Sequence, residues 1–145
     1  MNNDTQIDSF RGEYEFLSNF YREAFQYGNI IYPTSEHAFQ AAKMVRDEDR
    51  WRVAQASTPR IAKNLGRALP MWTNWDDVKQ QIMLDILRHK FNVPHMAVKL
   101  TNTRNLYLIE GNTWGDTYWG VCKGVGTNHL GRLLMQVRQE LNSAH

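Results

Sequence analysis

The chain has 145 residues, 42% hydrophobic and 22% charged, with a net charge of +2. A chain of this length is expected to fold as one domain and to bury about two thirds of the surface that its unfolded form exposes. There is no apolar run of about 20 residues and no signal-peptide pattern, which predicts a cytoplasmic protein without a membrane span. Residues 1–9 are polar and expected to be flexible, so the predicted single domain covers residues 10–145.

Cysteine and histidine usage indicates neither a disulfide nor a metal site. Cys122 is the only cysteine, and the five histidines lack the close pairings that metals favour. We therefore expect no metal and no cofactor. The net charge is too small to indicate nucleic-acid binding, but the stretch from Lys43 to Arg67 is locally basic. That stretch is either a solvated helical surface or a surface that guides a nucleic acid.

The first expected elements are a hairpin and a helix. "FQYGNIIYP" has apolar residues on both sides of Gly28, which predicts a short hairpin that Pro33 ends. Thr34 or Ser35 then caps a helix, since small apolar residues follow at helical spacing. They are Ala38, Ala41, Ala42 and Val45.

Two more helices follow in the sequence. Ser57 or Thr58 is the predicted cap of a shorter helix, which Gly66 is expected to end. Residues 73–91 form the longest periodic segment, and acidic residues in its first turn suit the positive end of a helix. Its expected inward stripe consists of Val78, Ile82, Ile86 and Leu87.

The sequence of the C-terminal third predicts one strand and one helix. "LYLIEG" is typical of a strand that Gly111 ends. A last helix is indicated by a stripe of apolar residues: Leu130, Leu133, Leu134, Val137 and Leu141. Because the strands do not alternate with helices as in a doubly wound sheet, we predict a mainly helical α+β fold with a few short strands.

One face of the helix that follows Pro33 carries polar side chains. They are Glu36, Gln40, Lys43 and Asp47. Such a face is usually solvated, but the large apolar residues at its margin, among them Phe39, are also typical of a pocket floor. In an enclosed site, Glu36 would exchange a proton near neutral pH, and Lys43 would act as a nucleophile towards carbonyl carbon.

A second candidate is the loop "EGNTWGDTYWG", residues 110–120. Loops that a rigid scaffold positions often carry functional residues. Asp116 is either a second carboxylate, with Trp114 or Trp119 as a stacking wall, or part of a turn in a tryptophan-rich core. Because cleavage of a glycosidic bond generally takes two carboxylates, Glu36 and Asp116 are the candidate pair.

Two other segments allow both a functional and a structural interpretation. The glycine-rich residues 123–128 precede the last helix, whose N-terminal amides either bind phosphate or only join loop to helix. The aromatic-rich residues 10–21 include Asn19 and either line a ligand or pack the core. The chain has no Gly-x-Ser-x-Gly elbow and no His-Glu-x-x-His motif, so hydrolases built on those groups are unsupported.

Several segments, in order, resemble the NADAR family: "FLSNFY", "YPTSEHAFQAAK", "NW" before the long helix, "ILRHKF", "WGDTYWG" and "GVGTNHLGRLLMQVR". The resemblance covers nearly the whole chain, from Phe10 to Arg138. It implies a YbiA-like fold and hydrolysis of an N-glycosidic bond at C1 of a phosphorylated ribose. The family includes N-glycosidases of riboflavin-biosynthesis intermediates and similar enzymes that remove ADP-ribose from guanine bases. This chain departs from the family pattern after the tryptophan-glycine pair, where it has Val121 and Cys122. Family members often have an acidic or glycine-rich continuation there.

The resemblance implies roles for particular residues. By motif position, Glu36, Asp116 and Lys43 are the expected catalytic residues. The expected substrate-binding residues are Trp75, Trp119, Asn19, Phe39, Gly120 and Asn128.

Two mechanisms remain open. In the first, Glu36 manages protons at the leaving nitrogen or the attacking water, while Asp116 stabilises positive charge at C1. In the second, Lys43 forms a Schiff base with C1 before water releases the sugar. The rival class is a non-catalytic module that binds ADP-ribose or NAD. The expected partner is a small phosphoribosyl or ADP-ribosyl substrate, with nucleic acid only as a modified substrate.

Overall fold

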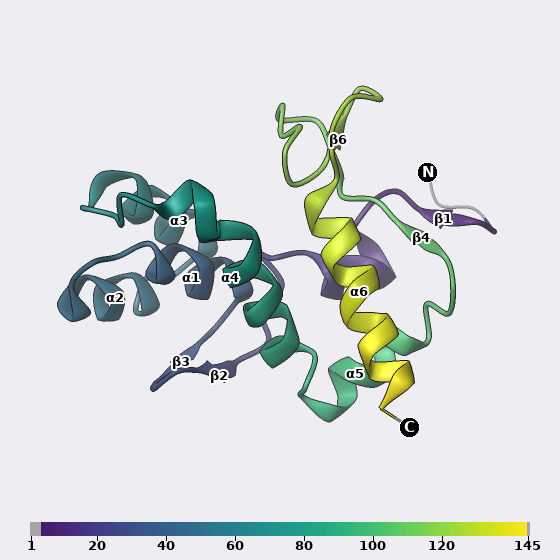
Figure 1. The fold of residues 1–145 in the computed structure, drawn as a ribbon, viewed down its shortest axis with the longest axis horizontal. Coiled ribbons are helices and arrows are strands. Elements are labelled where there is room, and N and C mark those ends of the chain that lie inside the picture. The colour runs from purple at the N-terminus through teal and green to yellow at the C-terminus, as the bar shows by residue number, and fades with distance from the viewer. Residues whose placement is uncertain (1–3, 145) are drawn as a thin grey trace. The chain divides into compact units, whose positions relative to one another are not determined.

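A computed structural model describes residues 4–144. The chain forms two compact units (Figure 1). The central unit comprises residues 19–90. The terminal unit combines the chain up to Ser18 with the chain from Phe91 onward. The mainly helical content with short strands confirms the predicted α+β class. Of the segment expected to be flexible, residues 1–3 lie outside the described residues.

The central unit begins with the predicted hairpin. Strand β2 (Phe25–Tyr27) pairs antiparallel with β3 (Ile30–Tyr32). Gly28 in the turn has a φ of 64°, a conformation that costs glycine little. The hairpin is therefore confirmed, and β2 packs against the last helix of the unit.

Four helices complete the central unit: α1 (Ser35–Ala42), α2 (Asp47–Ala54), α3 (Pro59–Ala68) and α4 (Trp75–Lys90). Helix α1 packs against each of the other three, so its residues from Ser35 to Ala41 are all buried, polar ones included. The expectation that this helix extends through Val45 is wrong. The helix ends at Ala42, and Val45 is exposed.

The predicted caps resolve to single residues. Thr34 Oγ1 accepts the His37 N–H at 3.1 Å, and Thr58 Oγ1 accepts the Ile61 N–H at 3.1 Å. Pro59 occupies the first turn of α3, where its missing N–H costs nothing.

Gly66 does not end the second helix as expected, because α3 continues to Ala68. Its role is close packing: a Cβ placed on Gly66 would lie 2.0 Å from Gln40 Oε1. Only a residue without a side chain lets α3 approach α1 this closely while Gln40 keeps its position.

Helix α4 confirms half of its expected inward stripe. Ile86 and Leu87 are fully buried, whereas Val78 and Ile82 are only half-buried. Trp75 opens the helix and is also buried. Helix α2 has no counterpart among the predicted elements, since its acidic and basic residues give it no apolar stripe.

The terminal unit contains short elements that are distant in sequence. They are β1 (Gln6–Ile7), η1 (Gly12–Leu17), α5 (Pro94–Thr101), β4 (Tyr107–Leu108), β5 (Gly111–Asn112), β6 (Val121–Cys122) and α6 (His129–Ser143). Strands β1 and β4 pair in parallel, as do β5 and β6. Ile7 is fully buried, so the ordered chain begins before Phe10. The predicted strand forms only in part, and Gly111 starts β5 instead of ending it.

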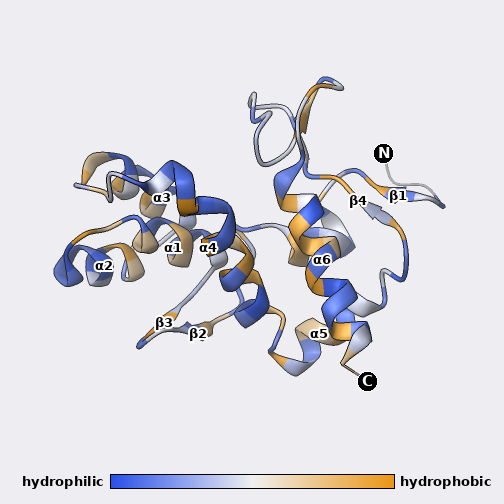
Figure 2. Cartoon of the chain, in the orientation of Figure 1, coloured by the Kyte–Doolittle hydropathy of each residue, from blue (hydrophilic) through white to orange (hydrophobic). Residues whose placement is uncertain are grey.

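The last helix is confirmed. In α6, Leu130, Leu134 and Val137 are buried, and Figure 2 shows hydrophobic and hydrophilic residues alternating along its turns. It packs against α5 and β4. Helix α5 itself was not expected, because Pro94 reads as a stop signal, yet here it occupies the first turn of the helix. Among the described residues, no helix has the length and apolarity to cross a bilayer.

Candidate active site

Several hydrogen bonds hold the start of α1 in place. The Glu36 backbone N–H donates to the Asn19 carbonyl oxygen at 2.9 Å, and Ser35 Oγ donates to Asn19 Oδ1 at 2.9 Å. The Asn19 amide in turn lies 3.8 Å from the sulfur of Met83 in α4. Asn19 therefore fixes the first turn of α1, which carries Glu36.

His37 braces the same turn from inside. Its Nε2 lies 2.9 Å from the Ala56 carbonyl oxygen, and its Nδ1 lies 2.7 Å from Thr34 Oγ1. A carbonyl oxygen only accepts, so Nε2 carries the proton and donates it. Burial lowers the pKa of His37, which keeps the ring neutral. His37 thus ties α1 to the segment between α2 and α3.

The side chain of Glu36 is enclosed, with only 8% of the residue exposed. Its Oε2 accepts a hydrogen bond from Gln40 Nε2 at 2.6 Å. Burial raises the pKa of Glu36, and the bond from Gln40 and the positive charges of Lys63, Lys43 and Arg67 act in the opposite direction. The solvated interpretation of this face is therefore wrong for Glu36 and Gln40, which are buried. A carboxylate with a raised pKa suits proton transfer near neutral pH.

Aromatic side chains and a lysine stand next to one another on α1 and α4. The rings of Phe39 and Trp75 have centroids 5.0 Å apart and are tilted by 57°. Lys43 Nζ lies 5.9 Å from the centroid of each ring. Burial lowers the pKa of Lys43, while Glu36 raises it. The Trp72 N–H donates to the Lys43 carbonyl oxygen at 3.0 Å and holds this end of α1 beside the start of α4.

The central unit therefore contains five of the residues expected to be functional. They are Glu36, Lys43, Asn19, Phe39 and Trp75. The fourth member of the predicted polar face, Asp47, is exposed in α2, because α1 ends before reaching it.

Sequence reasoning missed two positively charged neighbours of Glu36. These are Lys63 and Arg67 of α3, and their charges act on both Glu36 and Lys43. The signal available in the sequence is their spacing of four residues on one helix, but only the packing of α3 on α1 shows which residues they approach.

Asp116 lies in the terminal unit and organises its own loop. Its Oδ1 accepts the backbone N–H groups of Tyr118 at 3.1 Å and Trp119 at 2.9 Å. Its own N–H donates to Asn112 Oδ1 at 3.0 Å. The Trp119 ring packs edge-on to Tyr118, with centroids 4.9 Å apart. The turn interpretation of Asp116 thus describes its contacts within this unit.

Gly120 and Asn128 also have internal contacts. A Cβ on Gly120 would lie 1.9 Å from Glu110 Oε2, so no side chain fits there. The buried Asn128 accepts the Glu110 N–H and donates to the Leu108 carbonyl oxygen, each at 2.9 Å. These contacts favour a structural role for Asn128.

The N-terminus of α6 does not match the phosphate-binding interpretation. The His129 N–H donates to the Tyr118 carbonyl oxygen at 3.1 Å, and the Leu130 N–H donates to that of Trp119 at 2.9 Å. Because these amides are already bonded, the loop-to-helix interpretation holds for them.

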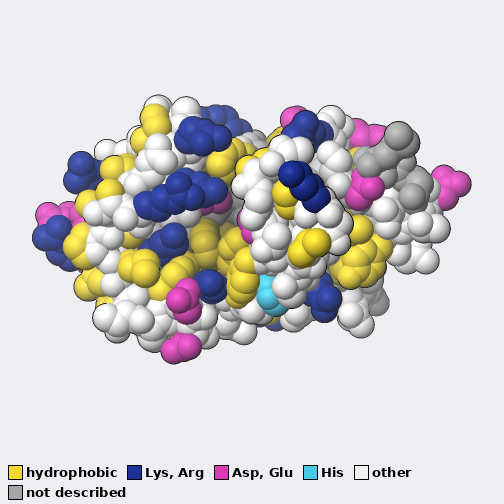
Figure 3. All heavy atoms as spheres, turned by 90° about the horizontal axis from the view of Figure 1, so that it is seen from above, with side chains coloured by type: hydrophobic (Ala, Val, Ile, Leu, Met, Phe, Trp, Pro, Cys, Tyr) yellow, Lys and Arg dark blue, Asp and Glu magenta, His cyan; other side chains and the backbone are white. Residues whose placement is uncertain are grey.

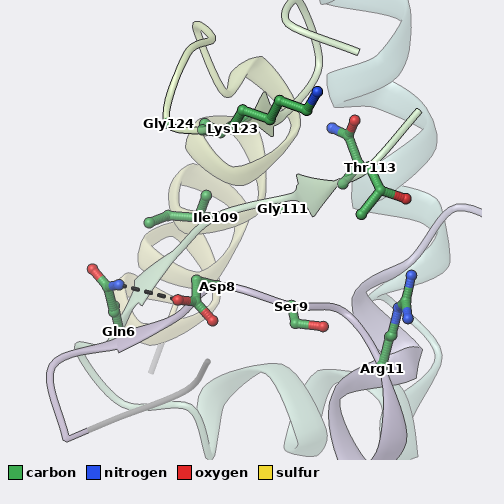
Figure 4. A pocket seen from close by; sticks show the side chains of 11 residues that line it. Gln6, Asp8, Ser9, Arg11, Ile109, Gly111, Thr113, Lys123 and Gly124 are labelled. Atoms are coloured by element: carbon green, nitrogen blue, oxygen red, sulfur yellow. Dashed lines mark hydrogen bonds between the residues drawn. The ribbon is translucent and has the colours of Figure 1, made fainter. Parts of the chain in front are cut away.

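An open pocket of about 530 Å³ lies in the terminal unit (Figure 4). It is lined by parts of residues 6–11, 109–113 and 121–124. None of the expected catalytic residues lines it. Within residues 4–144, no three His, Cys, Asp or Glu side chains are grouped as the ligands of a metal would be.

Comparison with known proteins identifies the family of this chain. Residues 7–142 match the NADAR domain. N-glycosidase YbiA of Shigella flexneri serotype 5b is 38% identical over 133 residues, which cover 89% of this chain and 82% of that protein. A riboflavin biosynthesis protein of Vibrio vulnificus is 36% identical over 131 residues, 87% of this chain and 35% of that protein. The NMR structure of E. coli YbiA matches with a TM-score of 0.86 and 34% identity, covering 99% of this chain and 89% of that one.

Proposed function

The chain belongs to the NADAR family, and we propose that it is an N-glycosidase that hydrolyses the bond between a base or amine nitrogen and C1 of a phosphorylated ribose. Relatives named N-glycosidase YbiA support the reaction, and a relative named for riboflavin biosynthesis supports an intermediate of that pathway as substrate. We further propose that residues 10–145 make up one functional domain, since the family match spans both units.

The observation that carries the proposal is the environment of Glu36. It combines burial, a hydrogen bond from Gln40 and a raised pKa with the nearby Phe39 and Trp75 rings. The two rings are buried and tilted by 57° to each other, and aromatic rings of this kind are the side chains that pack on heterocyclic leaving groups. The carboxyl group of Glu36 suits the transfer of a proton to the leaving nitrogen or from the attacking water.

In the proposed reaction the bond between C1 and nitrogen breaks, and a water oxygen bonds to C1. Protonated Glu36 gives its proton to the leaving nitrogen, and the carboxylate then takes one from water, so the enzyme ends as it began. Asp116 is the proposed second carboxylate, which stabilises positive charge at C1. Trp119, Gly120 and Asn128 are the proposed substrate-binding residues of the terminal unit, which substitutions would test.

Lys43 offers a variant of this route. Burial lowers its pKa, which increases the fraction of neutral amine able to attack an imine carbon. Borohydride added during turnover would reduce a Schiff base between Lys43 and C1 to a stable adduct with a defined mass. Full turnover by Lys43→Ala would exclude this route.

The decisive experiment offers purified protein two substrates side by side. One is a ribosylamine phosphate of the riboflavin pathway, and the other is DNA carrying ADP-ribosylated guanine. Mass spectrometry of the products identifies which bond is cut. We expect cleavage of the ribosylamine. Cleavage of the DNA adduct alone would assign the second activity of the family, and tight ADP-ribose binding without cleavage of either would show a binding module.

A further inference from the structure

Two positively charged residues follow the line where α3 meets α1. Ala62 and Gly66 are the buried residues of α3, and Gly66 faces Gln40 at close range. Lys63 and Arg67 each come one position later, so they lie four residues apart along one edge of this contact. Glu36, Gln40 and Lys43 form the matching row on α1 by their spacing.

Within residues 4–144, none of Lys43, Lys63 and Arg67 has a carboxylate partner at salt-bridge distance. In the left part of Figure 3, Lys and Arg side chains gather beside hydrophobic ones over the central unit. Like charges placed together repel one another, and a bound anion would remove that repulsion.

Gln40 links the two rows. Its Nε2 donates to Glu36 Oε2 at 2.6 Å, and its Oε1 packs against Gly66 of α3, where an added Cβ would lie 2.0 Å from it. The residue is only 3% exposed. Gln40 therefore holds the row on α1 close to the cations of α3.

We propose that Lys63 and Arg67, with Lys43, form the subsite that binds the phosphate of the substrate. The identification of the ligand as a sugar phosphate rests on the proposed function. The subsite makes the enzyme selective for phosphorylated ribosides over unphosphorylated ones. Lys79 of α4 contributes less, because it is paired with Asp76 at 3.1 Å.

The side-chain chemistry fits a phosphomonoester. Such a group carries a charge of about −1.5 to −2 at pH 7 and three acceptor oxygens. The planar guanidinium of Arg67 can bind two of these oxygens at once, and the ammonium of Lys63 acts as a point charge. The subsite is expected to be weaker when the phosphate is protonated, below about pH 6.

A binding experiment tests the subsite without turnover. Calorimetry compares D-ribose 5-phosphate with D-ribose on the wild type, Lys63→Met, Arg67→Met and the control Arg52→Met, an exposed arginine of α2. We expect the wild type and the control to prefer the phosphate at least tenfold, and each subsite variant to lose roughly ten- to hundredfold in affinity for it. Equal affinity of the wild type for both sugars would overturn the proposal, as would variants that bind like the control.

A kinetic experiment separates this proposal from the proposed function. With a ribosylamine phosphate as substrate, we expect Arg67→Met and Lys63→Met to raise KM by a larger factor than they lower kcat, and the wild type to discriminate against the unphosphorylated ribosylamine. Wild-type turnover with unchanged KM in both variants would remove the subsite and leave the N-glycosidase. Phosphate-selective binding without turnover of any riboside would leave the subsite and remove the N-glycosidase.

Discussion

Glu36 and Asp116 are both carboxylates of the predicted site, but their two units treat them differently. Glu36 lies on a buried helix and accepts one side-chain hydrogen bond, and its pKa is raised by burial. Asp116 is half-buried in a loop and accepts two backbone N–H groups. Burial thus disfavours the charged form of Glu36, whereas Asp116 defines the conformation of its loop through hydrogen bonds.

The difference shows how a reactive group can be distinguished from a structural one. Two backbone donors stabilise a carboxylate and define a turn, whereas desolvation disfavours the charged form and gives no stability in return. A protein keeps a costly buried carboxylate when function needs it. Substitutions at the two positions test this contrast.

The largest effect is expected from Glu36→Gln. The amide keeps the shape and the contact with Gln40 but cannot transfer a proton, so kcat should fall by roughly 10³-fold. Because the variant removes a desolvated charge, its Tm should rise by a few degrees at neutral pH. Steady-state kinetics and thermal melting check both, with Glu48→Gln, an exposed residue of α2, as the control. Wild-type activity in Glu36→Gln would end the assignment.

Asp116→Asn should have the next largest effect. Asparagine keeps the oxygen that accepts the Tyr118 and Trp119 N–H groups but removes the charge. We expect kcat to fall by roughly a hundredfold with little change in Tm. Asp116→Ala also removes the acceptor, and should lower the free energy of unfolding by about 1–2 kcal/mol as well. An active Asp116→Asn would restrict this residue to its role in the loop.

Gly66→Ala tests the support of Glu36. The new methyl group would displace the Gln40 carboxamide and break its bond to Glu36, which should lower kcat/KM by roughly tenfold. Alanine in place of glycine within a helix offsets part of the lost stability, by about 0.5–1 kcal/mol. In a Gln40→Ala background the same substitution should be nearly neutral, as a double-mutant cycle would show. Equal effects in both backgrounds would place the damage elsewhere.

The smallest predicted effect is on the pH dependence of stability. The folded-state pKa of Glu36 is raised above its ordinary value of 4.5, so the unfolded chain loses this proton first as pH rises. Stability of the wild type should therefore decrease, relative to Glu36→Gln, as pH rises from about 4.5 through the folded pKa. Below that window the two proteins should differ least. Denaturant titrations between pH 3.5 and pH 8 would measure the difference; a gap that is independent of pH would contradict the raised pKa.

The sequence predicted the fold best where local signals were strong. The hairpin at Gly28 and the caps at Thr34 and Thr58 depend on neighbouring residues, and each is present in the structure. The stripe of α6 is present in part, since Leu133 and Leu141 are only half-buried. Helix α2 was missed because only Asp49 and Val53 of its residues are buried, so it shows no apolar period.

The site could be predicted only in part. Helical spacing groups Glu36 with Lys43, but periodicity alone favours solvent beside such a face. Its burial follows from α2, α3 and α4 packing around one helix, which no local pattern encodes. Lys63 and Arg67 were missed for the same reason, since their charges act on Glu36 only because α3 packs on α1.

The close approach of Gly66 to Gln40 also constrains the history of the sequence. Either first step breaks the bond between Gln40 and Glu36, since a side chain at position 66 displaces the carboxamide and a shorter residue 40 removes it. The two positions are therefore expected to vary together among descendants of a common ancestor.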